Sequence, residues 1–304
     1  MAVYKCGAQK RLGEDGEPEC DYEAPTKWRG RCPRCGRAFK VVKVGADGKR
    51  EKTRATFATM QAAKIKPRIK TNIPEFDKVL NGGIPEGSTV VISGDAGVGK
   101  TSLLMITADA IMSKGGKKVV YYAGEQNEND LAEYAQRFKV KSDVVVHATQ
   151  QSINIYEALD EVERDNADVL ILDSLQTSLC PDSKGDVGST EQGRAVILVL
   201  TEWAKKKNVA VFLVSHVNKE GELAGAKANE HLVDGTLEFD RAPELSDDGA
   251  PLERTKNWRR LTSGAKFRLG ESFVSTVFDM TEEGIKPVRT KSSLLSLVRD
   301  EDDD

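Results

Sequence analysis

Residues 90–101 read VVISGDAGVGKT and contain the pattern that decides the fold. An apolar, β-branched run ends in G-x-x-x-x-G-K-T and passes directly into residues 102–105, SLLM, which predicts a strand, a phosphate-binding loop and a helix. The glycines let backbone N–H groups converge on phosphate oxygens at the positive end of the helix. Lys100 is expected to reach the β- and γ-phosphates of ATP, and the Thr101 hydroxyl to bind Mg²⁺. The predicted nucleotide-binding residues are Gly94, Asp95, Ala96, Gly97, Val98, Gly99, Lys100, Thr101 and Ser102.

The composition is that of a soluble globular protein, because 39% of the 304 residues are hydrophobic and 31% are charged. This length allows one α/β domain with a small additional domain. No apolar run is long enough to span a bilayer, and residues 1–5 lack the basic-then-apolar layout of a signal peptide. A cytoplasmic location and no membrane partner are therefore expected.

The charge is distributed unevenly along the chain. Residues 1–70 carry 18 Lys or Arg against 8 Asp or Glu, whereas the remainder carries 27 against 40. An acidic core argues against nucleic acid covering its outer surface, so any contact with nucleic acid must come from local loops or from the basic N-terminal arm.

Four of the five cysteines lie in the first 35 residues. The C-P-R-C-G stretch at 32–36 is typical of a zinc knuckle, but the 13 residues between the first two cysteines are unusual for a zinc ribbon. We expect a four-cysteine Zn²⁺ site, with a metal-free or three-ligand site as the alternative. Disulfides are a poorer explanation in a cytosolic protein. The predicted zinc ligands are Cys6, Cys20, Cys32 and Cys35, and Cys180 is expected to be a free thiol.

Beyond the phosphate loop, strand and helix patterns alternate, which predicts a mostly parallel α/β sheet with helices on both faces. The expected strands are 117–123, 142–147, 168–173 and 209–216, and the expected helices are 100–113, 127–138, 153–164 and 190–207. Three further segments, 231–239, 257–268 and 272–280, are expected as antiparallel strands at one sheet edge. The expected domains are a zinc ribbon at 1–40, a basic flexible linker at 41–70, an ATPase domain at 71–290 and an acidic tail at 291–304.

Three polar side chains follow predicted parallel strands, where open α/β sheets bind ligands. Asp173 ends a buried strand and is expected to orient Mg²⁺. Glu125 is expected to polarise the water that attacks the γ-phosphate, with a helix-capping acid as the alternative. His216 is placed to sense the γ-phosphate, with a purely structural histidine as the alternative.

Two long connections, 177–191 and 217–230, show no core pattern and are expected on the catalytic side of the sheet. In ring-forming ATPases of this architecture, such loops line the central hole and bind single-stranded DNA. Neither connection has an aromatic platform for bases, so binding to the DNA phosphates, independent of sequence, is expected rather than base readout. The predicted DNA-binding residues are Lys184, Lys219 and Lys227.

These motifs together give the chain a family resemblance. It resembles the RadA/Sms family of bacterial DNA-repair ATPases, which have a RecA-type core and DnaB-like helicase behaviour. The resemblance covers residues 1–290 approximately and includes 27–30 (KWRG), 94–101, 124–125 (GE), 173–177 (DSLQT), 215–221 (SHVNKEG) and 230–234 (EHLVD).

The family signature K-N-R-F-G appears here as K-F-R-L-G at 266–270, with both cations and the glycine retained. The resemblance implies that Lys266 and Arg268 reach the nucleotide of a neighbouring subunit in a hexameric ring; without it, an exposed basic β-hairpin would be the simpler interpretation. Three departures from the family are this altered motif, the insertion at 7–19 and the end at residue 304, which implies that the Lon-protease-like C-terminal domain is absent. The acidic tail resembles partner-recruiting tails of replication proteins, or is a solubilising end.

The resemblance favours an ATP-dependent single-stranded-DNA translocase or helicase that acts in homologous recombination, DNA repair and branch migration. The alternative is a nucleotide-gated adaptor that recruits a recombinase or helicase through its zinc ribbon without motor activity. A third hypothesis, a signalling ATPase resembling KaiC, shares the 71–83 segment, but the zinc ribbon and the 266–270 motif count against it.

Overall fold

The computed structural model describes residues 66–149, 151–216, 231–242 and 257–288, together with the backbone of three short strands near the N-terminus. These strands form a small antiparallel sheet in the order β2-β1-β3. They are β1 (Tyr4–Cys6), β2 (Glu23–Ala24) and β3 (Val41–Lys43). The last of them lies in the stretch expected as linker. The cysteine side chains of the predicted zinc site and residues 291–304 lie outside the described residues.

The main sheet has nine strands in the order β16-β15-β14-β13-β6-β12-β10-β7-β8. Six neighbouring strands, from β13 to β8, are parallel, and the last three strands of the chain are antiparallel. The parallel strands are β6 (Thr89–Gly94), β7 (Val119–Ala123), β8 (Val145–Ala148), β10 (Val169–Asp173), β12 (Ala210–His216) and β13 (Gly235–Arg241). The antiparallel strands are β14 (Trp258–Phe267), β15 (Ser275–Thr281) and β16 (Gly284–Pro287).

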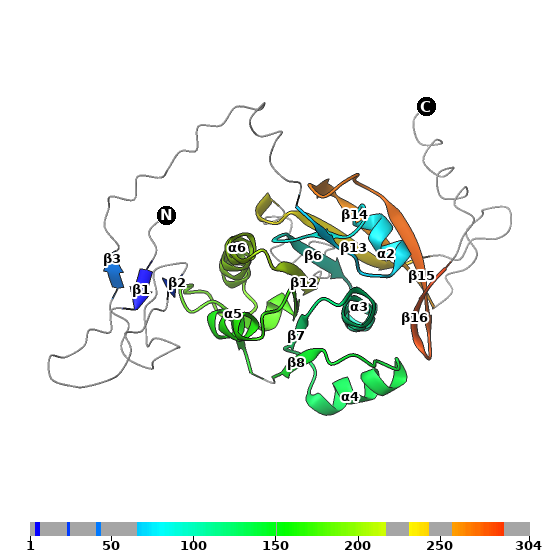
Figure 1. Cartoon of the computed structure of the whole chain (residues 1–304), viewed down its shortest axis with the longest axis horizontal. Coiled ribbons are helices and arrows are strands. Elements are labelled where there is room, and N and C mark those ends of the chain that lie inside the picture. The colour runs from blue at the N-terminus through cyan, green and yellow to red at the C-terminus, as the bar shows by residue number, and fades with distance from the viewer. Residues whose placement is uncertain are drawn as a thin grey trace.

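Helices cover both faces of this sheet, as Figure 1 shows. One face packs on α2 (Pro74–Val79), α3 (Lys100–Gly115) and α4 (Glu128–Arg137), and the other on α5 (Ile155–Arg164) and α6 (Thr190–Lys207). Successive strand residues serve opposite faces: Leu170 and Leu172 join the α5–α6 core, whereas Val169 and Ile171 join the α2–α3 core. This burial on both sides explains the continuous apolar runs of the central strands.

The predicted alternation of strands and helices is confirmed, and the four expected helices are α3 to α6. Two short pairings and one 3₁₀ turn complete the described elements. They are β4 (Arg68–Ile69) with β5 (Ile84–Pro85), β9 (Ile153–Asn154) with β11 (Ser178–Leu179), and η1 (Leu175–Thr177).

The expectation that residues 231–239 form an antiparallel edge strand is wrong. Strand β13 runs parallel to β6 and lies between β6 and β14. Strands β12 and β13 flank β6 on opposite sides, so the chain crosses over β6 between them and returns in the same direction. Such a crossover needs a long connection, which the 18 residues between His216 and Gly235 provide.

The connection at 177–191 is more closely packed than its polar sequence predicts. Ser178 and Cys180 are buried, Cys180 is a free thiol as expected, and its backbone N–H donates to Gln192 at 3.1 Å. The Tyr156 hydroxyl donates to Asp182 at 3.0 Å. Only the outer part, including Lys184, is exposed, and the second connection, 217–230, lies outside the described residues. No helix in the described ranges combines the length and hydropathy needed to cross a bilayer.

Candidate active site

The phosphate-binding loop joins β6 to α3 and is shaped by glycines. Gly97 and Gly99 have φ values of 73° and 107°, in the left-handed region that favours glycine. Gly99 is also the N-cap of α3, and no side chain caps this helix end. The first N–H groups of α3 therefore have no side-chain acceptor, and they lie at the positive end of the helix dipole. This arrangement fits the phosphates of a nucleotide.

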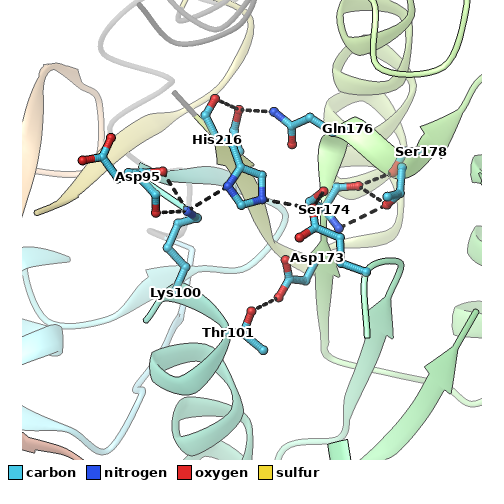
Figure 2. Close-up of polar contacts among 12 residues, drawn as sticks. Asp95, Lys100, Thr101, Asp173, Ser174, Gln176, Ser178 and His216 are labelled. Atoms are coloured by element: carbon cyan, nitrogen blue, oxygen red, sulfur yellow. Dashed lines mark hydrogen bonds and ion pairs between the residues drawn. The ribbon is translucent and has the colours of Figure 1, made fainter. Parts of the chain in front are cut away.

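Lys100 lies inside the loop with its ammonium group surrounded by acceptors. Its Nζ donates to the carbonyl oxygens of Gly94 at 2.7 Å and Asp95 at 2.9 Å, and contacts Nδ1 of His216 at 3.1 Å (Figure 2). Burial lowers the pKa of Lys100, whereas the carboxylates of Asp173 and Glu125 oppose that shift. The ammonium thus lies between the phosphate loop and the carboxyl ends of β10 and β12.

Asp173, the last residue of β10, is almost fully buried. Its Oδ2 accepts a hydrogen bond from the Thr101 hydroxyl at 2.6 Å (Figure 2). The same atom accepts a hydrogen bond from the Tyr121 hydroxyl at 2.9 Å. Burial raises the pKa of Asp173, and the two hydroxyl donors oppose that rise. A carboxylate and a hydroxyl that meet below a phosphate loop are the oxygen ligands that Mg²⁺ uses together with phosphate oxygens and water. In the described part of the chain, no group of three or more His, Cys, Asp or Glu side chains could hold a metal ion, so Mg²⁺ bound here would need phosphate oxygens and water as further ligands.

Glu125, just after β7, is connected to Lys100 through His216. The Oε1 atom of Glu125 lies 3.0 Å from Nε2 of His216 and accepts a hydrogen bond from the Ser174 hydroxyl at 2.6 Å. A lysine ammonium can only donate, so Nδ1 of His216 accepts from Lys100 and Nε2 carries the proton that it donates to Glu125. A continuous hydrogen-bonded chain therefore runs from the phosphate loop to the candidate catalytic carboxylate.

These contacts lower the pKa of Glu125 to about 2. The hydrogen bond from His216 is the largest cause; partial burial opposes it, and Ser174 adds to the lowering. Glu125 is therefore ionised at neutral pH, as a base that receives a proton from water must be.

This shift predicts a specific acid sensitivity. The folded-state pKa lies below the ordinary value of 4.5, so the ionised carboxylate stabilises the fold fully above pH 4.5, and that stability is lost as pH falls toward 2. The stability advantage of the wild-type chain over Glu125→Gln should therefore shrink as pH falls below 4.5. Thermal unfolding of both proteins between pH 3 and pH 7 measures it, and an advantage independent of pH over this range would contradict the assignment.

The structure brings together five of the residues selected from the sequence. Lys100, Thr101, Glu125, Asp173 and His216 lie at the carboxyl ends of β6, β7, β10 and β12. Lys219 and Lys227 lie outside the described residues.

Lys266 and Arg268 are at the opposite end of the sheet. Phe267, between them, pairs with Gly235 of β13, and Gly235 pairs with Val90 near the start of β6. Arg268 donates to the carbonyl oxygens of Val233 and His231, each at 3.2 Å, and stays partly exposed. Neither residue therefore belongs to the phosphate site of its own chain.

Sequence reasoning missed three residues of this site: Tyr121, Ser174 and Gln176. Tyr121 and Ser174 hold the two carboxylates, and the Gln176 amide donates at 3.4 Å to the Ser215 hydroxyl, which joins η1 to β12. The position of Ser174, directly after the strand-ending Asp173, was a signal that could have been used. The role of Tyr121 has no comparable signal, because an aromatic residue in a buried strand is usually core.

Comparison with known proteins agrees with this geometry. Residues 51–222 match a family described as an AAA domain. The chain belongs to this family. A solved structure of a KaiC-like protein from Pyrococcus horikoshii is similar with a TM-score of 0.57 and 21% identity, over 74% of this chain and 100% of that one. This AAA domain thus has the predicted RecA-like α/β fold.

Proteins named DNA repair protein RadA are among the relatives of this chain. The protein from Listeria monocytogenes is 33% identical over 285 residues, that from Bacillus subtilis 32% over 288, and that from Aquifex aeolicus 31% over 286. Each comparison covers 90% of this chain but only 59% of the relative. The predicted resemblance to RadA is confirmed, and the chain spans 59% of the length of these relatives.

Proposed function

We propose that the chain is an ATP-dependent single-stranded-DNA translocase or helicase that acts in DNA repair and homologous recombination, including branch migration. Its hexameric ring would hydrolyse ATP at subunit interfaces. The observation that carries this proposal is the hydrogen-bonded chain from Lys100 through His216 to Glu125, beside the Thr101–Asp173 pair. The names of the RadA relatives supply the DNA-repair context.

The proposed hydrolysis assigns a role to each member of the site. The uncapped N–H groups of α3 and the Lys100 ammonium bind the β- and γ-phosphates. Glu125 accepts a proton from water as the water oxygen bonds to the γ-phosphorus and the bond to the ADP oxygen breaks, giving ADP and phosphate. Thr101 and Asp173 would hold Mg²⁺, which supplies charge neutralisation at the phosphates.

His216 would report the state of the nucleotide. Lys100 cannot be fully engaged by a γ-phosphate and also donate unchanged to His216, so phosphate binding alters the contact at Nδ1. Nε2 of the same ring contacts Glu125, and the chain passes from His216 directly into the 217–230 connection. We therefore assign His216 the role of a sensor that links the γ-phosphate to the proposed DNA-binding connection.

Catalysis would also need a cation from a neighbouring subunit. Lys266 makes no hydrogen bond or ion pair within the described ranges, and it lies at the end of the sheet away from the phosphate loop of its own chain. A ring that stacks protomers head to tail brings opposite ends of neighbouring sheets together. The register of β14 thus supports a role in trans for Lys266, with Arg268 beside it.

Single-stranded DNA should stimulate ATP hydrolysis severalfold if the motor function is correct. The measurement compares ATPase rates with no DNA and with a single-stranded oligonucleotide. A triple Lys184→Gln, Lys219→Gln, Lys227→Gln variant should bind DNA more weakly. The slope of the logarithm of its binding constant against the logarithm of salt concentration should be smaller in magnitude by about 2, since each phosphate contact on a single strand contributes about 0.7. An equal rate with and without DNA would contradict the motor function.

The N-terminal cysteines are proposed to bind Zn²⁺. Cys6, Cys20, Cys32 and Cys35 form a donor set that suits tetrahedral zinc, and a segment this small needs the metal in order to fold. About one equivalent of zinc per chain in the purified protein would support this site. If a variant with three of these four cysteines replaced still binds zinc, the four-cysteine site is excluded.

A further inference from the structure

The phosphate loop packs against strands that follow residue 230 and lie outside the matched segment 51–222. The Ser93 hydroxyl, at the end of β6, donates to the carbonyl of Leu237 on β13 at 3.1 Å. Gly99 lies against Met280 of β15, and a side chain at this position would overlap the Met280 Cε. The phosphate loop therefore depends on a part of the chain that has no assigned role at the nucleotide site of its own protomer.

Arg259 makes the strongest of these contacts. It belongs to β14, is only 5% exposed, and its Nε donates to the carbonyl oxygen of Val98 inside the loop at 2.7 Å. A second guanidinium nitrogen donates to the carbonyl of Trp258 at 3.0 Å, which fixes the plane of the group. A charged donor at this distance is stronger than an ordinary neutral one, and its burial excludes competing water.

Val98 occupies a sensitive position in the loop. Its N–H donates to the carbonyl of Asp95 at 3.3 Å, which closes the turn, and its side chain is buried. A loop that binds phosphate must present N–H groups to the ligand and keep its carbonyl oxygens away, because carbonyl oxygens repel phosphate. The contact with Arg259 holds the Val98 carbonyl on the β14 side of the loop.

We propose that Arg259 is a positioning residue of the nucleotide site, which fixes the phosphate loop in its binding shape from behind and adds positive charge beneath the phosphates. The inference rests on the proposed use of this loop for ATP. It extends the site to β14, the strand that carries Lys266 seven residues further on. Arg259 acts through the Val98 backbone and touches no reacting atom.

The test is the steady-state kinetics of Arg259→Gln in the full-length chain without DNA. The KM for ATP should rise at least about tenfold, as expected for loss of a buried hydrogen bond from a charged group. The value of kcat should change by less than about threefold, because Lys100, Glu125 and Asp173 are unaltered. A general packing defect would instead lower kcat through loss of folded protein and leave KM unchanged.

Arg260 provides the matched control. It is the next residue on β14, so its side chain lies on the opposite face of the sheet, where it is exposed and 3.8 Å from Asp240 of the neighbouring strand β13. Arg260→Gln should leave KM within about twofold, as surface substitutions generally do. If Arg259→Gln does not fold, Arg259→Met, of similar volume and without donors, decides the question. A folded Arg259 variant with wild-type KM and wild-type ADP affinity, measured by calorimetry, would overturn the inference, whatever the effect of DNA on the rate.

Discussion

Glu125→Gln should abolish ATP hydrolysis while leaving ATP binding intact. The amide keeps the size of the side chain and can still pair with Ser174 and His216, but it cannot accept a proton from water. Loss of a general base typically reduces kcat by 10² to 10⁴, so we expect a decrease of at least about a hundredfold. Nucleotide binding should persist because Lys100 and the loop N–H groups are unaffected. Single-turnover hydrolysis with equilibrium binding of ATP separates these effects.

Glu128→Gln is the matched control for this variant. Glu128 is an exposed acid in the first turn of α4, three residues from Glu125, and it makes no contact with Lys100, Ser174 or His216 in the described structure. Its kcat should match the wild type. A Glu125→Gln protein that hydrolyses ATP within about threefold of the wild-type rate would remove Glu125 from its assigned role.

The same variant separates motor from adaptor. A motor needs a hydrolysis cycle, so Glu125→Gln should fail to support repair in cells that lack the wild-type protein. An adaptor switched by ATP binding alone should retain full repair function. Because the variant is expected to bind ATP, a failure to repair cannot be attributed to loss of the bound state.

Much of the placement of the candidate site's residues was predictable because these residues follow strands. The spacing of the phosphate loop fixes Lys100 and Thr101 relative to α3 through local backbone geometry alone. Asp173 and Glu125 each end an apolar run, and parallel strands bring their carboxyl ends to one edge. These inferences need only local patterns and one rule of topology.

The contacts between these residues were not predictable in the same way. Ser174 and Glu125 are 49 residues apart in sequence, and they meet because β7 and β10 are neighbours in the sheet. The order of strands is a property of the whole fold. The direction of β13 was mispredicted for a related reason: a strand pattern records which residues face the core, not which way the chain runs.

Arg259 illustrates a third kind of limit. A charged residue within an alternating strand pattern predicts a solvent-facing position, and Arg260 beside it does face solvent. Arg259 is buried because the phosphate loop, about 160 residues earlier in the chain, supplies a carbonyl acceptor there. Only the assembled fold shows that this arginine contacts the phosphate loop.

Lys266→Ala should reduce DNA-stimulated hydrolysis about 10³-fold if Lys266 acts on the nucleotide of the neighbouring subunit, as an arginine finger does. This factor is the lower end of the range for arginine fingers. The site in the same chain stays intact in this variant, since Lys266 lies at the opposite end of the sheet from Lys100. The missing cation can therefore be supplied by any neighbour that carries it. Lys100→Ala protomers carry it, although their own site is inactive.

The central claim is that each nucleotide is bound by one protomer and activated by the next, and mixing two inactive variants tests it most directly. In rings assembled at random from equal amounts of Lys100→Ala and Lys266→Ala, about a quarter of the interfaces combine an intact site with an intact Lys266 from the neighbour. The mixture should therefore hydrolyse ATP far faster than either variant alone. A mixture of Lys100→Ala and Glu125→Gln, which damage the same site, should stay inactive. A Lys100→Ala and Lys266→Ala mixture no faster than the mean of its components would contradict the claim.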